Sequence, residues 1–261
     1  MNLRAFQVDA FASGVFSGNP AVVVLLEEPL EDDILMKIAR ESFVPETAFL
    51  LKEGERYRLR WFTPDIEMDL CGHATLASAH VLFSELGYPH EKIVFNTNSG
   101  NLIVVRDGEM YEMDFPRREG ERATLPIEIY DSLSIKPVEV YKARDYLLIY
   151  NKRAEIEHIE IDRPVFDEIN INPGGVILSA PGEDCDFVSR YFTPQATILE
   201  DPVTGSAHCT LAPYWSKRLG KEILHAKQIS SRGGVIYCTV TPERVKLKGK
   251  AVTYSESRLN I

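Results

Sequence analysis

Short runs of apolar or alternating residues, separated by turn-forming residues, predict that most of the regular structure is β-strand. Residues 3–11 alternate loosely, and residues 21–26 (AVVVLL) form a β-branched run that is typical of a buried strand. In the first half of the chain, further strands are expected at residues 56–62, 92–95, 102–105 and 110–115. In the second half, strands are expected at residues 146–150, 176–179, 235–240 and 245–247.

The sequence contains fewer patterns typical of helices than of strands. Residues 75–86 are apolar nearly all round and stop at Gly87, so we expect a helix that is buried on every side and wrapped by the neighbouring strands. Acidic residues at positions 31–33 mark the start of another helix, whose apolar residues form a single stripe. That helix is expected on the outside. A short helix is also expected near residues 164–168.

The stretch around the buried helix occurs twice. Residues 60–64 (RWFTP) match residues 190–194 (RYFTP) at a constant offset, since 190 − 60 = 130. After a three-residue insertion the offset becomes 133, which brings Gly72 onto Gly205. A period this long does not suit a solenoid, whose units have roughly 20–50 residues. It predicts a duplicated domain, whose second central helix contains Pro213 and is expected to kink there.

The most charged and least apolar stretch is residues 116–123 (PRREGERA), and it is the expected boundary between the two copies. This gives an N-terminal lobe of residues 1–118 and a C-terminal lobe of residues 119–261. In each lobe, strands dominate around one central helix. The expected fold class is therefore α+β.

Composition narrows the classes of function. Among 261 residues, 29 are basic and 39 are acidic, which gives a formal net charge of −10. No basic stripe is present, so nucleic acid is not an expected partner. No unbroken apolar stretch approaches the roughly 20 residues that span a bilayer, and the N-terminal segment lacks a signal-peptide pattern. The four cysteines have no CxxC spacing, so disulfides and structural zinc are not expected. We expect a soluble cytoplasmic protein without a membrane partner.

The two equivalent glycines precede the two central helices. A helix start offers free N–H groups and about half a positive charge, which suits an anion such as a carboxylate. Gly72 and Gly205 are therefore candidates for parts of a binding site for a small acid. The alternative is that both glycines only allow tight turns. Their paired occurrence favours the ligand site.

Glu46 is the first candidate for catalysis. It lies in an apolar segment, FVPETAF, where burial is expected to raise the pKa of its carboxyl group, and such a carboxyl can take and return a proton. Its counterpart in the second copy is Val176, since 46 + 130 = 176, so the two copies differ at this position. The alternative is a glutamate on a strand edge that faces water.

Four further polar residues are near the predicted helix starts. His73 follows Gly72, and its counterpart is Ser206, since 73 + 133 = 206. Asp201 precedes the second helix, where it could simply cap the helix. Cys71 at the first helix start is either a reactive thiol or small apolar filling. No nucleophile elbow, metal-ligand spacing, phosphate loop or dinucleotide motif is present.

At these residues the sequence resembles the PhzF family of phenazine-biosynthesis isomerase-like proteins. The resemblance is carried, in the family's order, by DAF at 9–11, SGNP at 17–20, ETAF at 46–49, FTP at 62–64, CGHAT at 71–75 and EDPVTGSA at 200–207. It implies a fold similar to diaminopimelate epimerase, with two lobes that each wrap a β-barrel-like sheet around a central helix and an active site in the cleft. It also implies a homodimer.

The resemblance further implies a cofactor-independent isomerase of a small carboxylic acid, with no metal. The family's catalytic residues fall on Glu46, His73 and Asp201. Its substrate-binding positions fall on Asn19, Gly72, Ala74, Gly205 and Ser206. Related epimerases use two cysteines, but only Cys71 is present here, as a possible assisting thiol. An amino- or imino-acid epimerase using Glu46 and Cys71 stays open, as does a binding or scaffold protein without turnover.

Overall fold

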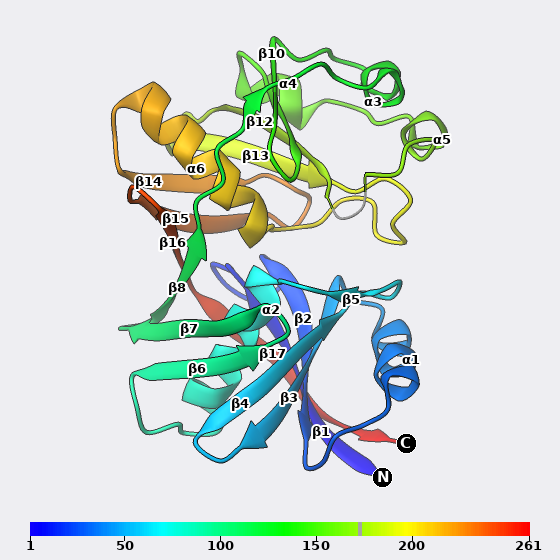
Figure 1. Ribbon diagram of the computed structural model, residues 1–261, viewed down its shortest axis with the longest axis vertical. Coiled ribbons are helices and arrows are strands. Elements are labelled where there is room, and N and C mark those ends of the chain that lie inside the picture. Colours follow the sequence, from blue (N-terminus) through cyan, green and yellow to red (C-terminus); the bar gives the residue numbers. More distant parts are fainter. Residues whose placement is uncertain (172–173) are drawn as a thin grey trace. The chain divides into compact units, whose positions relative to one another are not determined.

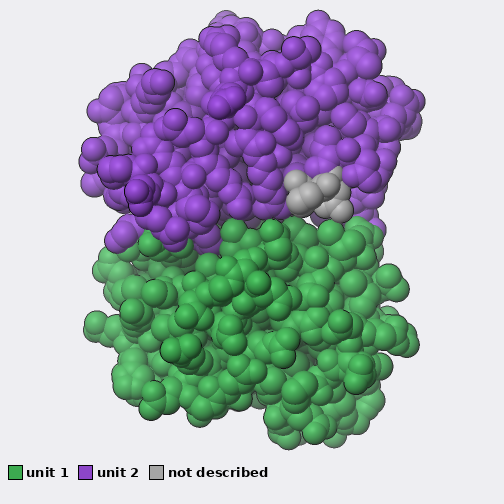
Figure 2. Space-filling view, viewed as in Figure 1, with its two compact units in different colours: residues 1–114, 247–261 green, residues 115–246 purple. Residues whose placement is uncertain are grey.

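The computed structural model describes residues 1–171 and 174–261 (Figure 1). The chain forms two compact units, which Figure 2 shows in different colours. Unit 1 contains residues 1–114 and 247–261, and unit 2 contains residues 115–246. Within the described ranges, none of the helices is both long and apolar enough to cross a membrane.

Unit 1 is a mixed sheet whose strands pair in the order β17, β1, β2, β3, β4, β6, β7, β8. Their bounds are β1 (Asn2–Ala10), β2 (Asn19–Leu26), β3 (Glu46–Glu53), β4 (Arg56–Phe62), β6 (Lys92–Thr97), β7 (Gly100–Asp107), β8 (Met110–Pro116) and β17 (Ala251–Asn260). The short β5 (Glu67–Met68) pairs with the end of β4. The predicted strands of the first half are thus confirmed, and β3, β5 and β17 are additional.

The central helix of unit 1 is α2 (Gly72–His80), and it packs against β1, β2 and β3. It continues as the π-helical turn η1 (Val81–Glu85), in which the Leu86 N–H donates to the Val81 carbonyl five residues earlier. Every residue from 72 to 83 is buried, which confirms the predicted buried helix. Helix α1 (Asp32–Ser42) lies on the outside of the unit, as predicted, and buries its apolar stripe against β3 and β4 (Figure 1).

Unit 2 repeats this topology. Strands β10 to β15 pair in chain order, and their pairs alternate between antiparallel and parallel, beginning and ending with an antiparallel pair. In unit 1 the strands β1, β2, β3, β4, β6 and β7 pair with the same alternation. The strand bounds are β9 (Glu121–Arg122), β10 (Glu139–Lys142), β11 (Tyr146–Ile149), β12 (Val176–Pro181), β13 (Phe187–Phe192), β14 (Ile223–Gln228), β15 (Gly234–Val240) and β16 (Arg244–Gly249), the last of which crosses the division between the units. The helices are α3 (Ile127–Ser132), α4 (Arg153–Glu157), α5 (Arg163–Phe166) and the central α6 (Gly205–Leu219).

The duplication extends to individual ion pairs. In unit 1, Arg60 Nε and Nη2 donate to the two carboxylate oxygens of Glu67 at 2.7 and 2.8 Å. In unit 2, Arg190 Nε and Nη2 donate to both oxygens of Glu200 at 2.7 and 2.9 Å. The arginines are 130 residues apart and the glutamates are 133 apart, since 200 − 67 = 133. The three-residue insertion therefore lies between the arginine and its glutamate, and the predicted duplicated domain is confirmed.

Proline inside α6 does not end the helix, which continues through Pro213 to Leu219. Pro213 has no N–H to donate to the Cys209 carbonyl one turn earlier. That carbonyl instead accepts a hydrogen bond from the backbone N–H of Arg118 at 3.0 Å. The bond that proline removes is thus replaced by a neighbouring segment of unit 2.

The two units differ from the predicted lobes, which were residues 1–118 and 119–261. The division lies at 114/115, and residues 247–261 return to unit 1. The physical reason is the pairing of β17 with β1, which runs antiparallel from Asn2 opposite Asn260 to Ala10 opposite Ala251. The hydrogen bonds of this long ladder tie the last strand to the first.

Candidate active site

The start of α2 in unit 1 brings together several of the predicted residues. Parallel pairing places Ala21, the third residue of β2, beside Glu46, the first residue of β3. Helix α2 packs on both strands and begins at Gly72, with Cys71 as its N-cap. The first turn contains no acidic residue, and the Cys71 side chain makes no capping hydrogen bond. This helix start therefore keeps its preference for an anion.

His73 is the centre of this cluster. Its Nε2 lies 3.1 Å from Glu46 Oε2, its Nδ1 lies 3.0 Å from the Asn19 amide nitrogen, and the Cys71 sulfur lies 3.6 Å from Nδ1. Because the Asn19 amide donates to Nδ1, the neutral ring carries its proton on Nε2, toward Glu46. Although the imidazole and the carboxylate are close enough for an ion pair, they are not aligned for a hydrogen bond. Within the described residues, neither Nε2 nor Oε2 has a hydrogen-bond partner.

Burial sets the charge states around His73. Burial disfavours the charged imidazolium, but the Cys71 sulfur and the Glu46 carboxylate together raise the pKa of His73 well above its ordinary value. Burial raises the pKa of the Cys71 thiol to about 11, so this thiol is neutral at neutral pH. The Glu46 side chain is 13% exposed, which excludes a strand-edge glutamate that faces water. The carboxyl group is therefore mostly desolvated, and its Oε2 oxygen is buried.

One donor atom each from Glu46, Cys71 and His73 lies within 4.8 Å of the other two, as in many metal sites. However, the carboxylate lies near Nε2 of the imidazole and the sulfur lies near Nδ1. A single metal ion would have to bind one ring nitrogen together with both other ligands. The arrangement suits proton transfer better than metal coordination.

The start of α6 in unit 2 carries the other predicted residues. Thr204 is the N-cap, and its hydroxyl donates to the Asp201 carboxylate. Gln228, which the sequence analysis did not single out, fixes this turn: its amide nitrogen donates to the Asp201 carbonyl at 2.7 Å, and its amide oxygen accepts from the Thr204 N–H at 2.8 Å. Ser206 is half-buried in the first turn, next to Gly205. Unit 2 thus contains a second helix start, and hydrogen bonds fix the conformation of the turn that precedes it.

The model of the PhzC-PhzF family, described as phenazine biosynthesis-like protein, matches residues 8–257. The chain belongs to this family. A Pseudomonas aeruginosa protein named an uncharacterized isomerase is 45% identical over 100% of both chains. These matches place the protein in the isomerase class, which confirms the predicted enzyme class.

Solved structures agree with the family assignment. An Enterococcus faecalis protein of the PhzF family superimposes with a TM-score of 0.94, at 42% identity and over 100% of both chains. A probable proline racemase from Agrobacterium radiobacter has a TM-score of 0.68 over 99% of this chain and 93% of that chain. At 10% identity it shares the fold alone. The predicted α+β class and epimerase-like fold are thereby confirmed.

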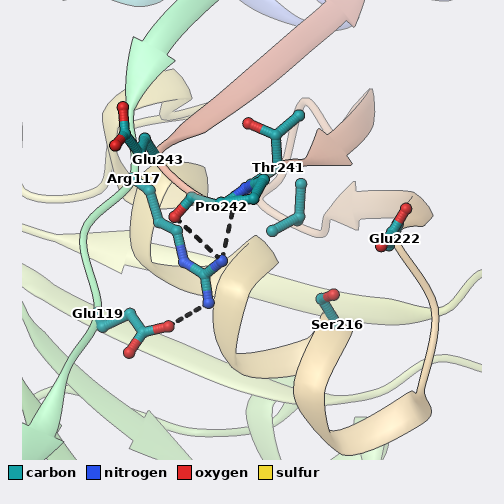
Figure 3. Close-up of a pocket in the computed structure, with 8 residues that line it drawn as sticks. Arg117, Glu119, Ser216, Glu222, Thr241, Pro242 and Glu243 are labelled. Atoms are coloured by element: carbon teal, nitrogen blue, oxygen red, sulfur yellow. Dashed lines mark hydrogen bonds and ion pairs between the residues drawn. The ribbon is translucent and has the colours of Figure 1, made fainter.

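A cavity of about 680 Å³ in unit 2 of this PhzF-family protein is separate from the predicted residues (Figure 3). On one side Arg117 donates to the carbonyls of Thr241 and Pro242, and the three acidic residues of its wall are Glu119, Glu222 and Glu243. None of the predicted site residues lines it. The excess of carboxylates makes it unsuitable for a small acid.

His208, a second residue that sequence reasoning missed, makes the stability of the PhzF-family fold sensitive to acid. Its ring donates from Nδ1 to the Thr204 carbonyl at 2.8 Å, and burial lowers its pKa from 6.5 to about 4. Between these values the unfolded chain binds a proton that the folded chain does not. We therefore expect the His208 contribution to the free energy of unfolding to fall by about 3 kcal/mol as the pH decreases from 6.5 to 4.

Urea unfolding of the wild type and of His208→Gln at several pH values checks this expectation. The difference in free energy of unfolding between the two proteins is expected to shrink on acidification. Other buried histidines contribute equally to both proteins and cancel. An unchanged difference across this pH range would contradict the assignment of a neutral, buried imidazole.

Proposed function

We propose that this PhzF-family protein is a cofactor-independent isomerase of a small carboxylic acid, in which Glu46 transfers the proton. One observation carries the proposal. The Glu46 carboxylate is mostly buried, lies 3.1 Å from a buried imidazole, and has an oxygen that no described residue engages by a hydrogen bond. A desolvated carboxylate with free acceptor capacity is suited to general acid–base catalysis.

The other residues of unit 1 have supporting roles in this proposal. The N–H groups at the start of α2, at Gly72 and Ala74, stabilise the negative charge that develops when a C–H proton leaves. His73 directs its Nε2–H toward Glu46 and the substrate. Asn19 orients the imidazole through its contact with Nδ1. Glu46 then returns the proton at another carbon.

On the basis of the family resemblance, Asp201, Gly205 and Ser206 are proposed as the contribution of unit 2. The hydrogen bonds of Asp201 and Gln228 around Thr204 support a preorganised helix start there. Ser206 supplies a half-exposed hydroxyl in the first turn of α6.

Proton NMR of a panel of small carboxylic acids in deuterated water tests the proposal. The enzyme is expected to replace one C–H proton of its substrate by deuterium and to form a second, isomeric product. Loss of the C–H signal together with a shift of a double bond to a new position in the unchanged carbon skeleton identifies an isomerase. Absence of exchange together with a ligand-induced increase in melting temperature would instead favour a binding protein without turnover.

The second candidate is an amino- or imino-acid epimerase that uses Glu46 and Cys71 as two acid–base groups. The position of the Cys71 sulfur beside His73 favours it, whereas the raised pKa of the thiol opposes it. We expect Cys71→Ser to keep the exchange rate within about tenfold of the wild type, because a neutral thiol is a weak base. Cys185→Ser, at another free cysteine, is the control. A loss of several orders of magnitude with Cys71→Ser alone, or inversion at Cα, would establish the two-base epimerase.

A further inference from the structure

A second cavity of unit 2, of about 260 Å³, lies between the second half of α6 and the edge of the sheet. Its lining residues come from the segment before β9, from β10 and β11, and from α6: Glu119, Gly120, Tyr141, Leu147, Pro213, Tyr214, Lys217 and Arg218. None of the predicted site residues is among these described lining residues. Pockets for drug-sized ligands usually measure about 300–1,000 Å³, so this cavity suits a smaller molecule with a single ring.

The cavity lies where the two copies of the duplication differ. In unit 1, β17 pairs with the whole length of β1. In unit 2, β9 takes the corresponding place beside β10, but its two residues pair only with Tyr141 and Lys142. The edge of the sheet is therefore covered less completely in unit 2 than in unit 1, which leaves room beside α6.

The ends of the two central helices differ in the same region. In unit 1, the His80 ring lies 3.0 Å from the Thr253 hydroxyl of β17, and this hydroxyl donates to Glu85 at 2.6 Å. These contacts tie the end of the helix to the last strand. The counterparts of His80 and Glu85 are Pro213 and Arg218, since 80 + 133 = 213 and 85 + 133 = 218. Both counterparts line the cavity, so unit 2 has a cavity at the place of this connection.

Aromatic and apolar side chains form much of the wall. Tyr141 and Leu147 are opposite each other in the β10–β11 ladder, so their side chains are on one face of the sheet. The rings of Tyr141 and Tyr214 pack edge to face, with centroids 5.2 Å apart. The Tyr141 hydroxyl donates to Glu139 at 2.7 Å, and the Tyr214 hydroxyl accepts from Arg218. The two tyrosines therefore contribute mainly ring surface to the cavity.

Lys217 is the charged lining residue whose charge is not engaged. Arg117 donates to Glu119, as Figure 3 shows. Arg218 forms an ion pair with Glu139 at 2.7 Å. Lys217 is exposed in the last turn of α6 and has no ion pair or hydrogen bond of its side chain to any described residue. An ammonium group beside aromatic walls suits a ligand that joins a negative charge to a ring.

We infer that this cavity of unit 2 binds a small aromatic carboxylate, whose ring packs against Tyr141 and Tyr214 and whose carboxylate pairs with Lys217. Contacts between aromatic rings stabilise a complex beyond the burial of area alone. The ion pair with the exposed Lys217 contributes a modest amount, because water screens it. The inference does not depend on the proposed function, since none of the proposed catalytic residues lines the cavity.

NMR titration of the ¹⁵N-labelled full chain with three ligands of similar size tests the site. Benzoate has an aromatic ring and a charge, cyclohexanecarboxylate has the charge without the aromatic ring, and benzamide has the ring without the charge. The backbone amide signals of Gly120 and Lys217 report on this cavity, and those of Gly72 and His73 report on the proposed active site. At Gly120 and Lys217, benzoate is expected to bind about threefold more tightly than either of the other two ligands.

Two lysines near the end of α6 form a matched pair of variants for the charge. Lys217→Gln is expected to abolish the difference between benzoate and benzamide at the Gly120 signal. Lys221→Gln changes the net charge equally, is outside the lining and is expected to keep that difference. Tyr214→Leu is expected to abolish the difference between benzoate and cyclohexanecarboxylate. If Tyr214→Leu does not fold, nuclear Overhauser effects from the benzoate ring to ¹³C-labelled tyrosines decide, with the Tyr214 signals assigned by Tyr214→Phe.

Any of three results would overturn the inference: signals of Gly120 and Lys217 that benzoate does not move, equal affinities for the three ligands, or equal effects of the two lysine variants. The absence of Overhauser effects to both tyrosines would do the same. Benzoate that moves only the signals of Gly72 and His73 binds at the proposed active site and counts against this cavity. Glu46→Gln is expected to leave the titration at Gly120 unchanged, so the proposed function can fail while this site stands.

Discussion

Glu46→Gln is expected to slow C–H exchange of the substrate by about three orders of magnitude, because removal of a positioned general acid–base group typically costs 10²–10⁴-fold. The glutamine amide has nearly the shape of the carboxyl group but cannot take a proton. The cluster around His73 should therefore persist, and substrate affinity should change little. Single-turnover exchange in deuterated water, measured beside a ligand-induced melting shift, separates the loss of chemistry from the loss of binding.

Glu53→Gln is the matched control, since Glu53 is the exposed last residue of the same strand, β3. It is expected to exchange at the wild-type rate. A Glu46→Gln enzyme that kept full exchange would exclude Glu46 as the proton-transfer group. An equal loss in both variants would mean that the strand, rather than the carboxylate, had been damaged.

Leu76→Ala is expected to lower the free energy of unfolding by about 4 kcal/mol. Leu76 is fully buried in α2, where the surrounding strands cannot close on a shortened side chain without distorting the sheet. The lost burial and the cavity that remains both contribute to this cost. Leu86→Ala, at a 38% exposed position just after the same helix, is the control and should cost far less.

The two tryptophans allow this effect to be assigned to a unit. Trp61 is buried in β4 of unit 1, and Trp215 is buried in α6 of unit 2. In a Trp215→Phe background, fluorescence during urea unfolding reports on unit 1 alone. A decrease in stability of less than about 1 kcal/mol for Leu76→Ala would contradict a tightly packed central helix.

The local pattern of apolar and polar residues was sufficient to predict those elements of the fold that consist of a continuous, buried apolar run. The central helix of unit 1 follows from apolar residues on all sides, and the duplication follows from the repeated RxFTP and glycine positions. The alternation of residues 3–11 located β1. These features depend on residues close in sequence, or on comparison of the chain with itself.

Strands that are stabilised mainly by their neighbours were missed. β17 contains the polar run Ser255-Glu256-Ser257, which has no strand signal of its own, and its pairing partner β1 lies at the other end of the chain. The two-residue β5 and the hydrogen bonds of Gln228 to Asp201 and Thr204 were also missed. Single-sequence periodicity carries no information about such contacts.

For the candidate site, the residue types were predictable and the geometry was not. Glu46, Cys71 and His73 were singled out from apolar context and from their place at a helix start, and the structure brings their donor atoms within 4.8 Å of one another. Asn19 was predicted as a site residue only from the family resemblance. Its contact with His73 shows that it can orient the imidazole ring.

The pairing of β17 with β1 has a consequence for the order of folding during synthesis. Unit 2 is one continuous segment, residues 115–246, so all of its strands have been made before residues 251–260 leave the ribosome. Most of unit 1 precedes unit 2 in the chain, yet its sheet lacks the strand that pairs with β1 until residues 251–260, which follow unit 2, have been made. Domains usually complete in the order of synthesis, N-terminal first. Here unit 1 is completed only after unit 2, and until then the edge of β1 that later pairs with β17 has unpaired backbone N–H and C=O groups.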